Sequence, residues 1–417
     1  MQTRPIRSTP ADPQELSAWL RLTATRGIGP LTGQRLLAAF GLPIKLFDAS
    51  ASRLRAVCAG LPNGARIASA LEQHDPERER EVARALQWVG AADSVPRAIV
   101  TLADPGYPPR LLHLADPPLL LFVEGAVQAL SVPQIAIVGS RNATPSGIAT
   151  ARDLAGALVR AGWAITSGLA EGIDHAAHLG ALSGALSSAL SGEPGGSPGG
   201  ALNPAGVNRT VAVMGTGIDR IYPMRHRQLA QDVAIHGALV SEQPVGSAPH
   251  AAHFPRRNRL IAALADGVVV VEAALRSGSL ITARAALDVG REVFAVPGSI
   301  HSPQSRGCHW LIRQGACLTE DVADIVQALV PTRSIDSISG RSNALDPVPG
   351  DVSAARDPRS NEAGQPLLAA LAGGPLTVDA LQAGTGIPVA HLLASLQKLE
   401  IEGRVEMGAD GRWYRHP

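Results

Sequence analysis

Two patterns of apolar residues divide most of the chain. Along residues 15–95 apolar side chains recur every three or four positions, as in EREREVARALQWVG, which is the period of an amphipathic helix. We therefore predict a helical domain over residues 1–95. From residue 96 to residue 330, short unbroken apolar runs alternate with helix-length segments. These runs lie at residues 135–140, 164–169, 210–217, 238–244, 267–273 and 292–299.

The unbroken runs predict strands that are buried on both faces, because a strand with one solvent-exposed face alternates apolar and polar residues instead. Strands that alternate with helices form βαβ units, in which the strands lie parallel. The predicted fold class is therefore α/β, with a doubly wound, mainly parallel sheet over residues 96–330.

Three other segments differ from these patterns. Residues 184–208 are nearly all small residues, Gly and Pro, so we expect a flexible surface insertion there. Residues 331–364 are rich in Ser, Pro, Asp, Arg and Gly and are predicted to be a linker. Residues 365–417 end in a helical pattern and two short strands around a Gly-Ala-Asp-Gly turn, an order typical of a winged helix.

Composition adds limits to this outline. Hydrophobic residues make up 45% of the chain, enough for a sizeable core, and the net charge is only +1. Any anion-binding site must therefore be built locally. The three cysteines, Cys58, Cys308 and Cys317, are widely spaced and suit neither a disulfide framework nor a metal site. With no apolar run of membrane-spanning length and no signal-peptide pattern, we expect a cytoplasmic protein.

Glycine, serine and charged residues follow the predicted strands. The sets are Gly139-Ser140-Arg141, Ser167-Gly168, Gly215-Thr216-Gly217 and Arg276-Ser277-Gly278-Ser279. The carboxyl ends of parallel strands share one edge of a sheet, where glycine lets backbone N–H groups approach a ligand. We therefore predict a ligand site at this edge. Thr144 and Pro145 suit the N-cap and first position of the next helix, so Arg141 should lie close to that helix N-terminus. There Arg141 would either bind a phosphate or form a surface salt bridge.

The stretch HFPRRNRLIA puts Arg256, Arg257 and Arg259 before an apolar helical run. Positive charge is unfavourable at a helix N-terminus unless an anion lies there, so these arginines form either a solvated helix start or a binding site. The preceding Phe254 suits a platform for a nucleic-acid base, or a hydrophobic contact that fixes the helix start.

Candidates for catalysis are weak. His175 and His178 share one helix face and suit either metal ligation or a structural pair. Glu272 ends an apolar run and suits either a general base or a ligand of backbone N–H groups. GTGID does not match the dinucleotide fingerprint, and no Walker A motif is present. We predict no cofactor, no metal and no catalytic residue.

Several motifs in a fixed order resemble the DNA-processing protein A family (DprA, also called Smf). They are GSRNATPSG, ITSGLAEGIDHAAHLGAL, TVAVMGTGIDRIYP, SEQPVG, HFPRRNRLIAALADGVVVVEAALRSGSLITARAALDVGREVFAVPGSI and GCHWLIRQGA. The resemblance covers residues 105–325 or so. It implies an extended Rossmann-like domain, and it extends to an N-terminal helical domain of the sterile-alpha-motif or helix-hairpin-helix kind and a C-terminal winged helix.

The resemblance implies a protein that is not an enzyme. It would bind and protect incoming single-stranded DNA and load the RecA recombinase during natural transformation, as a homodimer through the Rossmann-like domain. Carried over by position, the DNA-binding residues are Gly139, Ser140, Arg141, Ser167, Gly168, Gly172, Gly215, Gly217, Phe254, Arg257, Asn258, Arg259, Ser277, Gly278 and Ser279. Arg256 occupies the variable position of the FPxRNR pattern and is left out.

Two other functions remain open. Related Rossmann-like proteins cleave nucleoside monophosphates with a PGGxGT loop, but here the Pro-Gly pair at 297–298 is followed by Ser-Ile-His. The winged helix alternatively indicates a transcription regulator, although its second helix offers few base-reading residues. The hairpin Gly27-Ile28-Gly29 either presents N–H groups to phosphate or only packs between helices.

Overall fold

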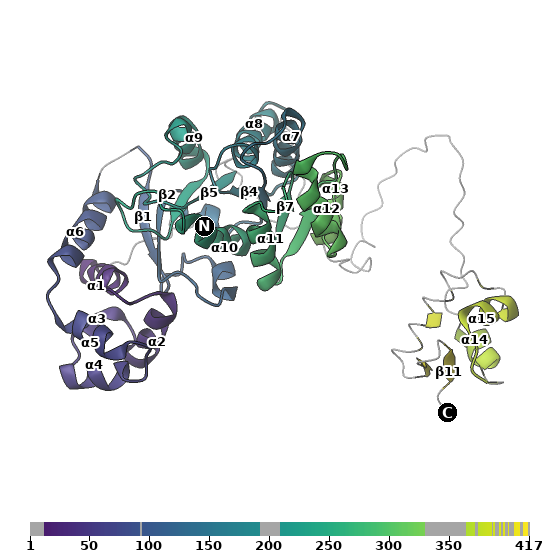
Figure 1. Cartoon of the computed structure of the whole chain (residues 1–417), viewed down its shortest axis with the longest axis horizontal. Coiled ribbons are helices and arrows are strands. Elements are labelled where there is room, and N and C mark those ends of the chain that lie inside the picture. Colours follow the sequence, from purple (N-terminus) through teal and green to yellow (C-terminus); the bar gives the residue numbers. More distant parts are fainter. Residues whose placement is uncertain are drawn as a thin grey trace, which may run out of the picture. The chain divides into compact units, whose positions relative to one another are not determined.

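A nine-stranded sheet is the centre of the first of two compact units in the computed structural model (Figure 1). The structure describes residues 12–91, 94–191 and 209–329, and residues 364–415 except 372–373, 386, 388–391, 393–394, 397–398, 400–403 and 409–411. The strands are β1 (Arg97–Thr101), β2 (Leu120–Gly125), β3 (Gln134–Val138), β4 (Ala164–Ser167), β5 (Thr210–Met214), β6 (Ala238–Ser241), β7 (Gly267–Val270), β8 (Glu292–Ala295) and β9 (Cys317–Leu318).

The strand order is β1-β2-β6-β5-β4-β3-β7-β8-β9. All neighbours from β6 to β9 pair in parallel, whereas β1–β2 and β2–β6 pair antiparallel. From β3 the chain builds outward through β4, β5 and β6, then returns to place β7, β8 and β9 on the other side of β3. The order therefore reverses between β3 and β7, and a crevice forms beyond the carboxyl ends of strands at such a point. The predicted doubly wound α/β fold is confirmed.

Helices cover both faces of the sheet. One face packs against α10 (His253–Leu264), α11 (Ser279–Asp288) and α12 (Arg306–Arg313). The other face packs against α7 (Pro145–Arg160), α8 (Ile173–Ser191) and α13 (Val322–Leu329) over β3, β4 and β7, and against α9 (Arg227–His236) over β5 and β6. Ile135 and Ile137 point to one face and Ala136 and Val138 to the other, which explains why β3 is apolar throughout.

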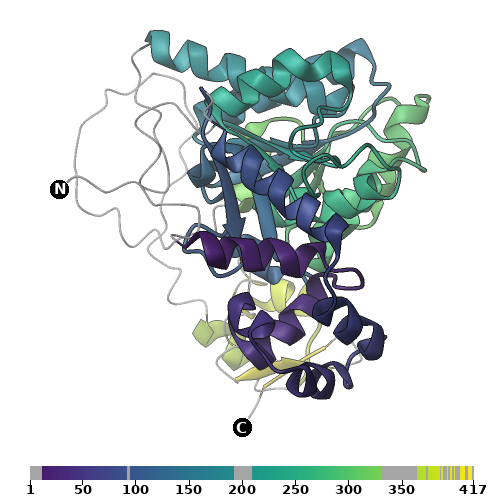
Figure 2. The ribbon, with the colours of Figure 1, turned by 90° about the vertical axis from the view of Figure 1, so that its left-hand side faces the viewer.

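The N-terminal helices lie against the sheet (Figure 2) and contribute to one hydrophobic core with it. They are α1 (Pro13–Ala24), α2 (Pro30–Phe40), α3 (Pro43–Phe47), α4 (Ala51–Cys58), α5 (Gly64–Glu72) and α6 (Pro76–Gly90). Trp88 of α6 meets Phe122 of β2 edge to face, with ring centroids 5.8 Å apart. Residues 1–335 consequently form one compact unit.

The prediction that a flexible insertion begins at residue 184 is wrong. Residue Gly184 lies inside α8, which continues to Ser191. A Cβ atom on Gly184 would lie 2.6 Å from the Cα atom of Gly156 in α7, so the two helices cross at a distance that only glycine permits. Residues 192–208 lie outside the described part of the chain, as does the expected linker from 331 to 363.

Within the second unit, residues 336–417, the described residues include the helices α14 and α15 and, after them, two antiparallel strands. These are α14 (Gly364–Ala370), α15 (Val378–Thr385), β10 (Val405–Met407) and β11 (Trp413–Arg415). Leu376 bridges to Trp413 and extends the small sheet, as the predicted winged helix requires. Among the described residues of both units, no helix is long and apolar enough to cross a membrane.

Candidate nucleic-acid interface

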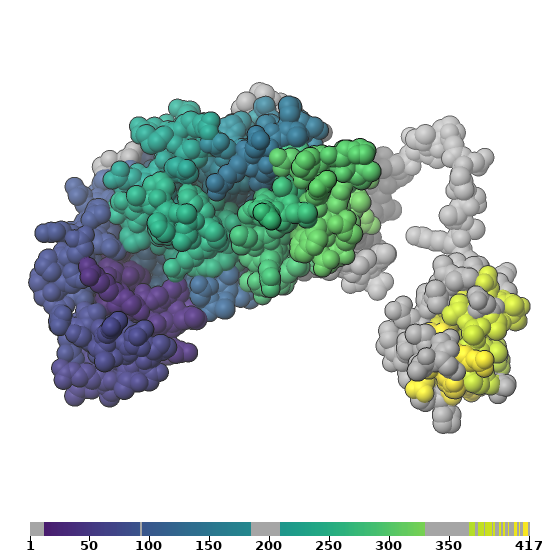
Figure 3. Space-filling model, in the orientation of Figure 1, coloured from purple at the N-terminus to yellow at the C-terminus, as the bar shows by residue number. Residues whose placement is uncertain are grey.

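A hollow of about 820 Å³ lies where the strand order reverses. Its walls are the loop after β3, the loop after β7, and the first turns of α10 and α11, which form the middle of the face drawn in Figure 3. Nine of the fifteen predicted site residues line it: Gly139, Ser140, Arg141, Phe254, Arg257, Asn258, Ser277, Gly278 and Ser279. We call this hollow the arginine pocket.

The charge of the arginine pocket is positive. Arg141, Arg257 and Arg276 line it, and Asp174 is the acidic residue in its lining. Arg141 and Arg276 are exposed, whereas Asp174 is 6% exposed. A ligand in the pocket therefore meets positive charge, although the chain as a whole carries only +1.

Arg257 holds the floor of the pocket together. Its side chain is 5% exposed, and its Nη1 donates to the carbonyl oxygens of Gly168, at 2.6 Å, and of Val213. Burial lowers the pKa of Arg257 to about 10, and the nearby Asp174 opposes that shift. The guanidinium remains charged at neutral pH and joins the ends of β4 and β5 at the pocket.

Asp174 orders the loop between β4 and α8. Its Oδ2 accepts hydrogen bonds from the backbone N–H groups of Gly168, at 3.1 Å, and Ala170, at 3.4 Å. Burial raises the pKa of Asp174, and Arg257 together with these bonds works against the rise. Gly172 closes the loop at φ +73°, where a Cβ atom would lie 2.2 Å from the carbonyl oxygen of Ser140.

An arginine and two aromatic rings lie side by side along one wall. The guanidinium carbon of Arg141 lies 5.6 Å from the ring centroid of Phe254, and that ring lies 5.6 Å from the ring of Tyr222. Phe254 rests on Gly215, where a Cβ atom would lie 2.9 Å from its Cδ1. The ring of Phe254 thus forms part of the pocket wall, a position that is compatible with the interpretation of this residue as a platform for a base.

The two helix N-termini at the crevice differ. At α7, Thr144 is the N-cap as predicted, but Glu272 already accepts from its backbone N–H, at 2.9 Å, and from its hydroxyl, at 2.5 Å. The carboxylate therefore occupies the mouth expected to take a phosphate. At α11 the N-cap is Gly278, and the N–H of Ser279 is bonded to the neutral hydroxyl of Ser277 at 3.3 Å, so the positive end of that helix still faces the pocket. Glu272 binds backbone, as one of its two interpretations proposed.

Six predicted site residues lie outside the lining. Ser167 is fully buried, and its Oγ donates to the carbonyl oxygen of Ile137. Gly168, Gly172 and Gly215 lie behind the lining and make room for the groups that form it. Gly217 bonds through its N–H to the carbonyl oxygen of Ser247, away from the pocket.

Arg259 is a correction to the sequence-based picture. Arg259 does not lie beside Arg141. Its Nη2 donates to both carboxylate oxygens of Glu242, at 2.7 and 2.6 Å, and its Nη1 donates to the carbonyl oxygen of Asp116. Both side chains of the Arg259–Glu242 pair are about nine-tenths buried, at 13% and 12% exposed. Successive residues of a helix point in different directions, so the FPxRNR pattern sends Arg257 and Arg259 to different neighbours.

Tyr222, Asn142 and Gln304 also line the pocket but were not among the predicted DNA contacts. Arg276 lines it too: it belonged to one of the sets that follow the predicted strands, but it was left out of the DNA contacts implied by the resemblance. Tyr222 stands eight residues beyond the end of β5, and no local pattern connects it to the pocket.

The histidine and glycine candidates have structural contacts. His178 is fully buried, bonds through Nδ1 to the Thr210 hydroxyl, and has a pKa lowered to about 3 by burial.

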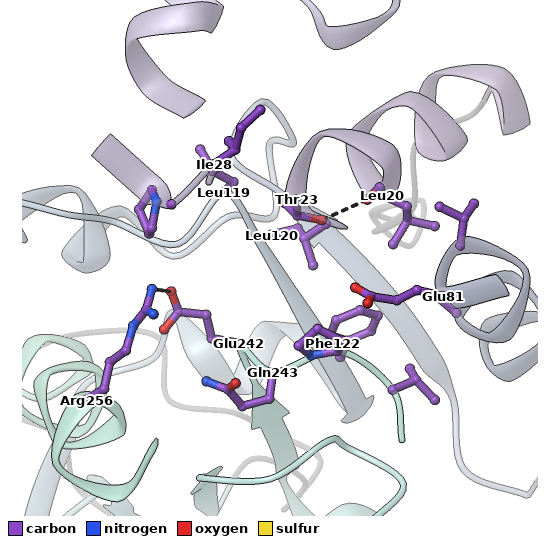
Figure 4. Close-up of a pocket in the computed structure, with 16 residues that line it drawn as sticks. Leu20, Thr23, Ile28, Glu81, Leu119, Leu120, Phe122, Glu242, Gln243 and Arg256 are labelled. Carbon is purple, nitrogen blue, oxygen red and sulfur yellow. Dashed lines mark hydrogen bonds and ion pairs between the residues drawn. The ribbon is translucent and has the colours of Figure 1, made fainter. Parts of the chain in front are cut away.

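At the glycine hairpin, Ile28 is buried and lines a cavity of about 180 Å³ between the N-terminal helices and the sheet. Figure 4 shows Glu81 pointing into this cavity and Glu242 paired with Arg256 at its other side, surroundings that repel a phosphate.

Comparisons with known proteins agree with this architecture. A family model described as DNA recombination-mediator protein A matches residues 98–330, and one described as the DprA winged helix domain matches residues 352–411. Protein Smf of Escherichia coli (strain K12) is 41% identical over 71% of this chain and 72% of its own length. Protein Smf of a Synechocystis species is 30% identical over 96% and 99%. The X-ray structure of DNA processing protein A from Streptococcus pneumoniae superimposes with a TM-score of 0.60 at 31% identity, over 75% of this chain and 97% of that one.

Proposed function

The chain belongs to the DNA recombination-mediator protein A family, and from this membership and the geometry of the arginine pocket we propose that it binds single-stranded DNA there. In this proposal the protein acts in the cytoplasm as a recombination mediator. It protects an incoming strand during natural transformation and loads the RecA recombinase onto it. It works by binding and not by catalysis.

The observation that carries the proposal is the pairing of exposed positive charge with an aromatic surface. Arg141 and Arg276 stand at the rim of the pocket, and Phe254 lies beside Arg141. A single strand offers just these two targets, phosphates and unstacked bases, and binding without sequence preference uses both. Duplex DNA hides its base faces, so the pocket should favour the single strand.

The positive end of α11 adds to the charge of the arginines. Ser277 and Gly278 precede this helix in the pocket lining, and the first N–H groups of the helix are bonded to these two residues. The helix dipole still favours an anion at this end. We assign phosphate contacts to Arg141 and Arg276, with a favourable field from this helix end, and a role in shaping the floor to Arg257.

We also propose that two copies pair through the sheet domain. Strand β9 is the last strand of the sheet, and among the described residues no strand covers its outer edge. Leu318 of this strand is 46% exposed and Trp310 of the adjacent α12 is 42% exposed. An unpaired strand edge flanked by apolar side chains suits pairing with a second copy. Light scattering should give a dimer for the native chain and a monomer for Trp310→Glu.

Fluorescence anisotropy with labelled oligo-dT tests the proposed binding. Arg141→Ala and Arg276→Ala should each weaken binding about ten- to hundredfold, since a charge-assisted hydrogen bond contributes about 1.5–3 kcal/mol. The matched control is Arg160→Ala, an exposed arginine at the far end of α7, on the opposite edge of the sheet. It should bind as the native chain does.

The same assay separates the alternatives. Equal affinity for duplex and single-stranded DNA, or unchanged binding in both pocket variants, would favour a winged-helix regulator over the mediator. Release of free base from a panel of nucleotides would favour the nucleotide-cleaving enzyme. RecA loading is tested by RecA filament assembly on strands coated with single-strand-binding protein, which should accelerate with the native chain and not with Arg141→Ala.

A further inference from the structure

A second hollow, of about 920 Å³, adjoins the arginine pocket. It lies over α9 and the ends of β1, β2 and β6, and its lining includes Trp88, Arg220, Met224, Arg227 and Ile235. We call it the α9 hollow. Both hollows fall in the range of about 300–1,000 Å³ that holds ligands of drug size, and a nucleotide is a ligand of that size.

The two hollows share a wall. Tyr222 and Pro249 line both of them. Tyr222 is 46% exposed, and its ring centroid lies 5.6 Å from that of Phe254. The series Arg141, Phe254, Tyr222 therefore leads out of the arginine pocket and ends where the α9 hollow begins.

The α9 hollow combines cationic and apolar groups. Its two carboxylates are engaged within the protein: Asp219 accepts from the N–H of Gly246 at 2.7 Å and pairs with Arg220 at 3.6 Å, and Glu124 pairs with Arg97 at 3.8 Å.

Arg227 is exposed and has no ion pair with a carboxylate of the described residues. Met224, at 65% exposed, and Ile235, at 54% exposed, add uncovered apolar surface.

We propose that the α9 hollow is a second binding site for the same single strand, which passes over Tyr222 as it leaves the arginine pocket. Tyr222 stacks on the base at the crossing, Arg227 binds a phosphate beyond it, and Met224 and Ile235 contact the following bases. This inference rests on the proposed function, because it extends the path of a strand held by Arg141 and Arg276.

A single strand fits this hollow better than a helix or loop of a partner protein. The approach from the arginine pocket is made of an arginine and two rings, a surface that stacks on bases. Arg227, the exposed cationic side chain in the hollow that has no ion pair with a described carboxylate, suits the phosphate that each further nucleotide brings.

Binding of oligo-dT of two lengths, about 4 and about 12 nucleotides, tests the path. Arg227→Ala should bind the short strand as the native chain does and the long strand about tenfold more weakly, with a salt slope smaller by about 0.7. Tyr222→Ala should lose about fivefold to a hundredfold on the long strand, the effect of one stacked base. Arg160→Ala is again the control.

Cross-linking gives a measurement that does not depend on affinity. In a Cys317→Ser background, Ile235→Cys should attack a long oligonucleotide that carries a tethered activated disulfide, forming a mixed disulfide with release of the small thiol leaving group, and should not react with a short one. Leu287→Cys, exposed at the far end of α11, is the control and should not react.

Unchanged long-strand affinity and salt slope in Arg227→Ala, with no cross-link at Ile235→Cys, would overturn the second site. If Arg141→Ala still weakens binding in that case, the proposed function stands and only the path fails. If Arg141→Ala also binds normally, the proposed function itself is wrong.

Discussion

Arg259 and Arg141 belong to one predicted set of DNA contacts, yet the structure gives them opposite surroundings. Arg259 is 13% exposed and bound to Glu242 and Asp116, whereas Arg141 is exposed at the rim of the arginine pocket. We therefore predict that Arg259→Ala lowers the stability of the fold and leaves DNA affinity intact. Arg141→Ala should do the reverse.

The contacts set the magnitude for Arg259. Removing one partner of a fully buried ion pair costs about 3–5 kcal/mol, and an exposed pair is worth about 0.2–1 kcal/mol. Arg256 remains 3.3 Å from Glu242 and compensates part of the loss. We expect Arg259→Ala to lower the free energy of unfolding by about 2–4 kcal/mol. Arg141 has no buried contact to lose, so its replacement should change that free energy by less than about 0.5 kcal/mol.

Urea unfolding and oligo-dT anisotropy, measured on both variants, check this pair of predictions. Addition of Glu242→Gln to Arg259→Ala should recover part of the stability, because the unpaired carboxylate is removed. A variant Arg259→Ala that unfolds like the native chain but loses DNA affinity and salt slope would refute the reasoning. It would return Arg259 to the DNA interface.

Three further predictions test the architecture around the pocket. Gly168→Ala places a Cβ 2.3 Å from Nη1 of the buried Arg257. Urea unfolding should show that the free energy of unfolding falls by about 2 kcal/mol or more, and anisotropy should show weaker DNA binding. Gly278→Ala is the control and should keep its stability, because no atom lies within 4 Å of the added Cβ. Glu272→Gln loses one acceptor and a charge at the start of α7, and a drop in unfolding free energy below about 0.5 kcal/mol would contradict its capping role. Burial lowers the pKa of His178 from 6.5 to about 3, so between pH 6.5 and pH 3 only the unfolded chain protonates this side chain. The contribution of His178 to the free energy of unfolding is therefore full above pH 6.5 and should fall by about 1.4 kcal/mol per pH unit below it. Urea unfolding at several pH values should show a smaller slope for His178→Asn.

The helical and strand patterns predicted the architecture well. All six apolar runs from 135 to 299 are strands of the parallel part of the sheet. The apolar composition of these runs identifies them as strands, because helices cover both faces of the sheet and each position along such a strand is therefore buried. The antiparallel strands β1 and β2 were missed, and β9 is too short, at two residues, to leave a pattern.

The candidate site was predicted only in part. Residues at strand ends, such as Ser140 and Arg141, reach the crevice because the fold class brings the carboxyl ends of parallel strands to one edge. Tyr222 comes from a loop whose path depends on packing, so neither motif spacing nor periodicity connects it to Phe254. The carboxylate of Glu272 likewise reaches the start of α7 from another strand, 128 residues along the chain.

The sequence by itself determined the α/β class, the parallel strands and the edge at which the loops rich in glycine and serine meet, because these follow from local periodicity and from the chirality of βαβ units. Only the tertiary structure decided which arginines face solvent. Arg259 finds its partners 17 and 143 residues away in the chain, and Arg257 finds carbonyl groups 44 and 89 residues away. Side-chain roles depend on such distant neighbours, which a pattern of consecutive residues does not contain.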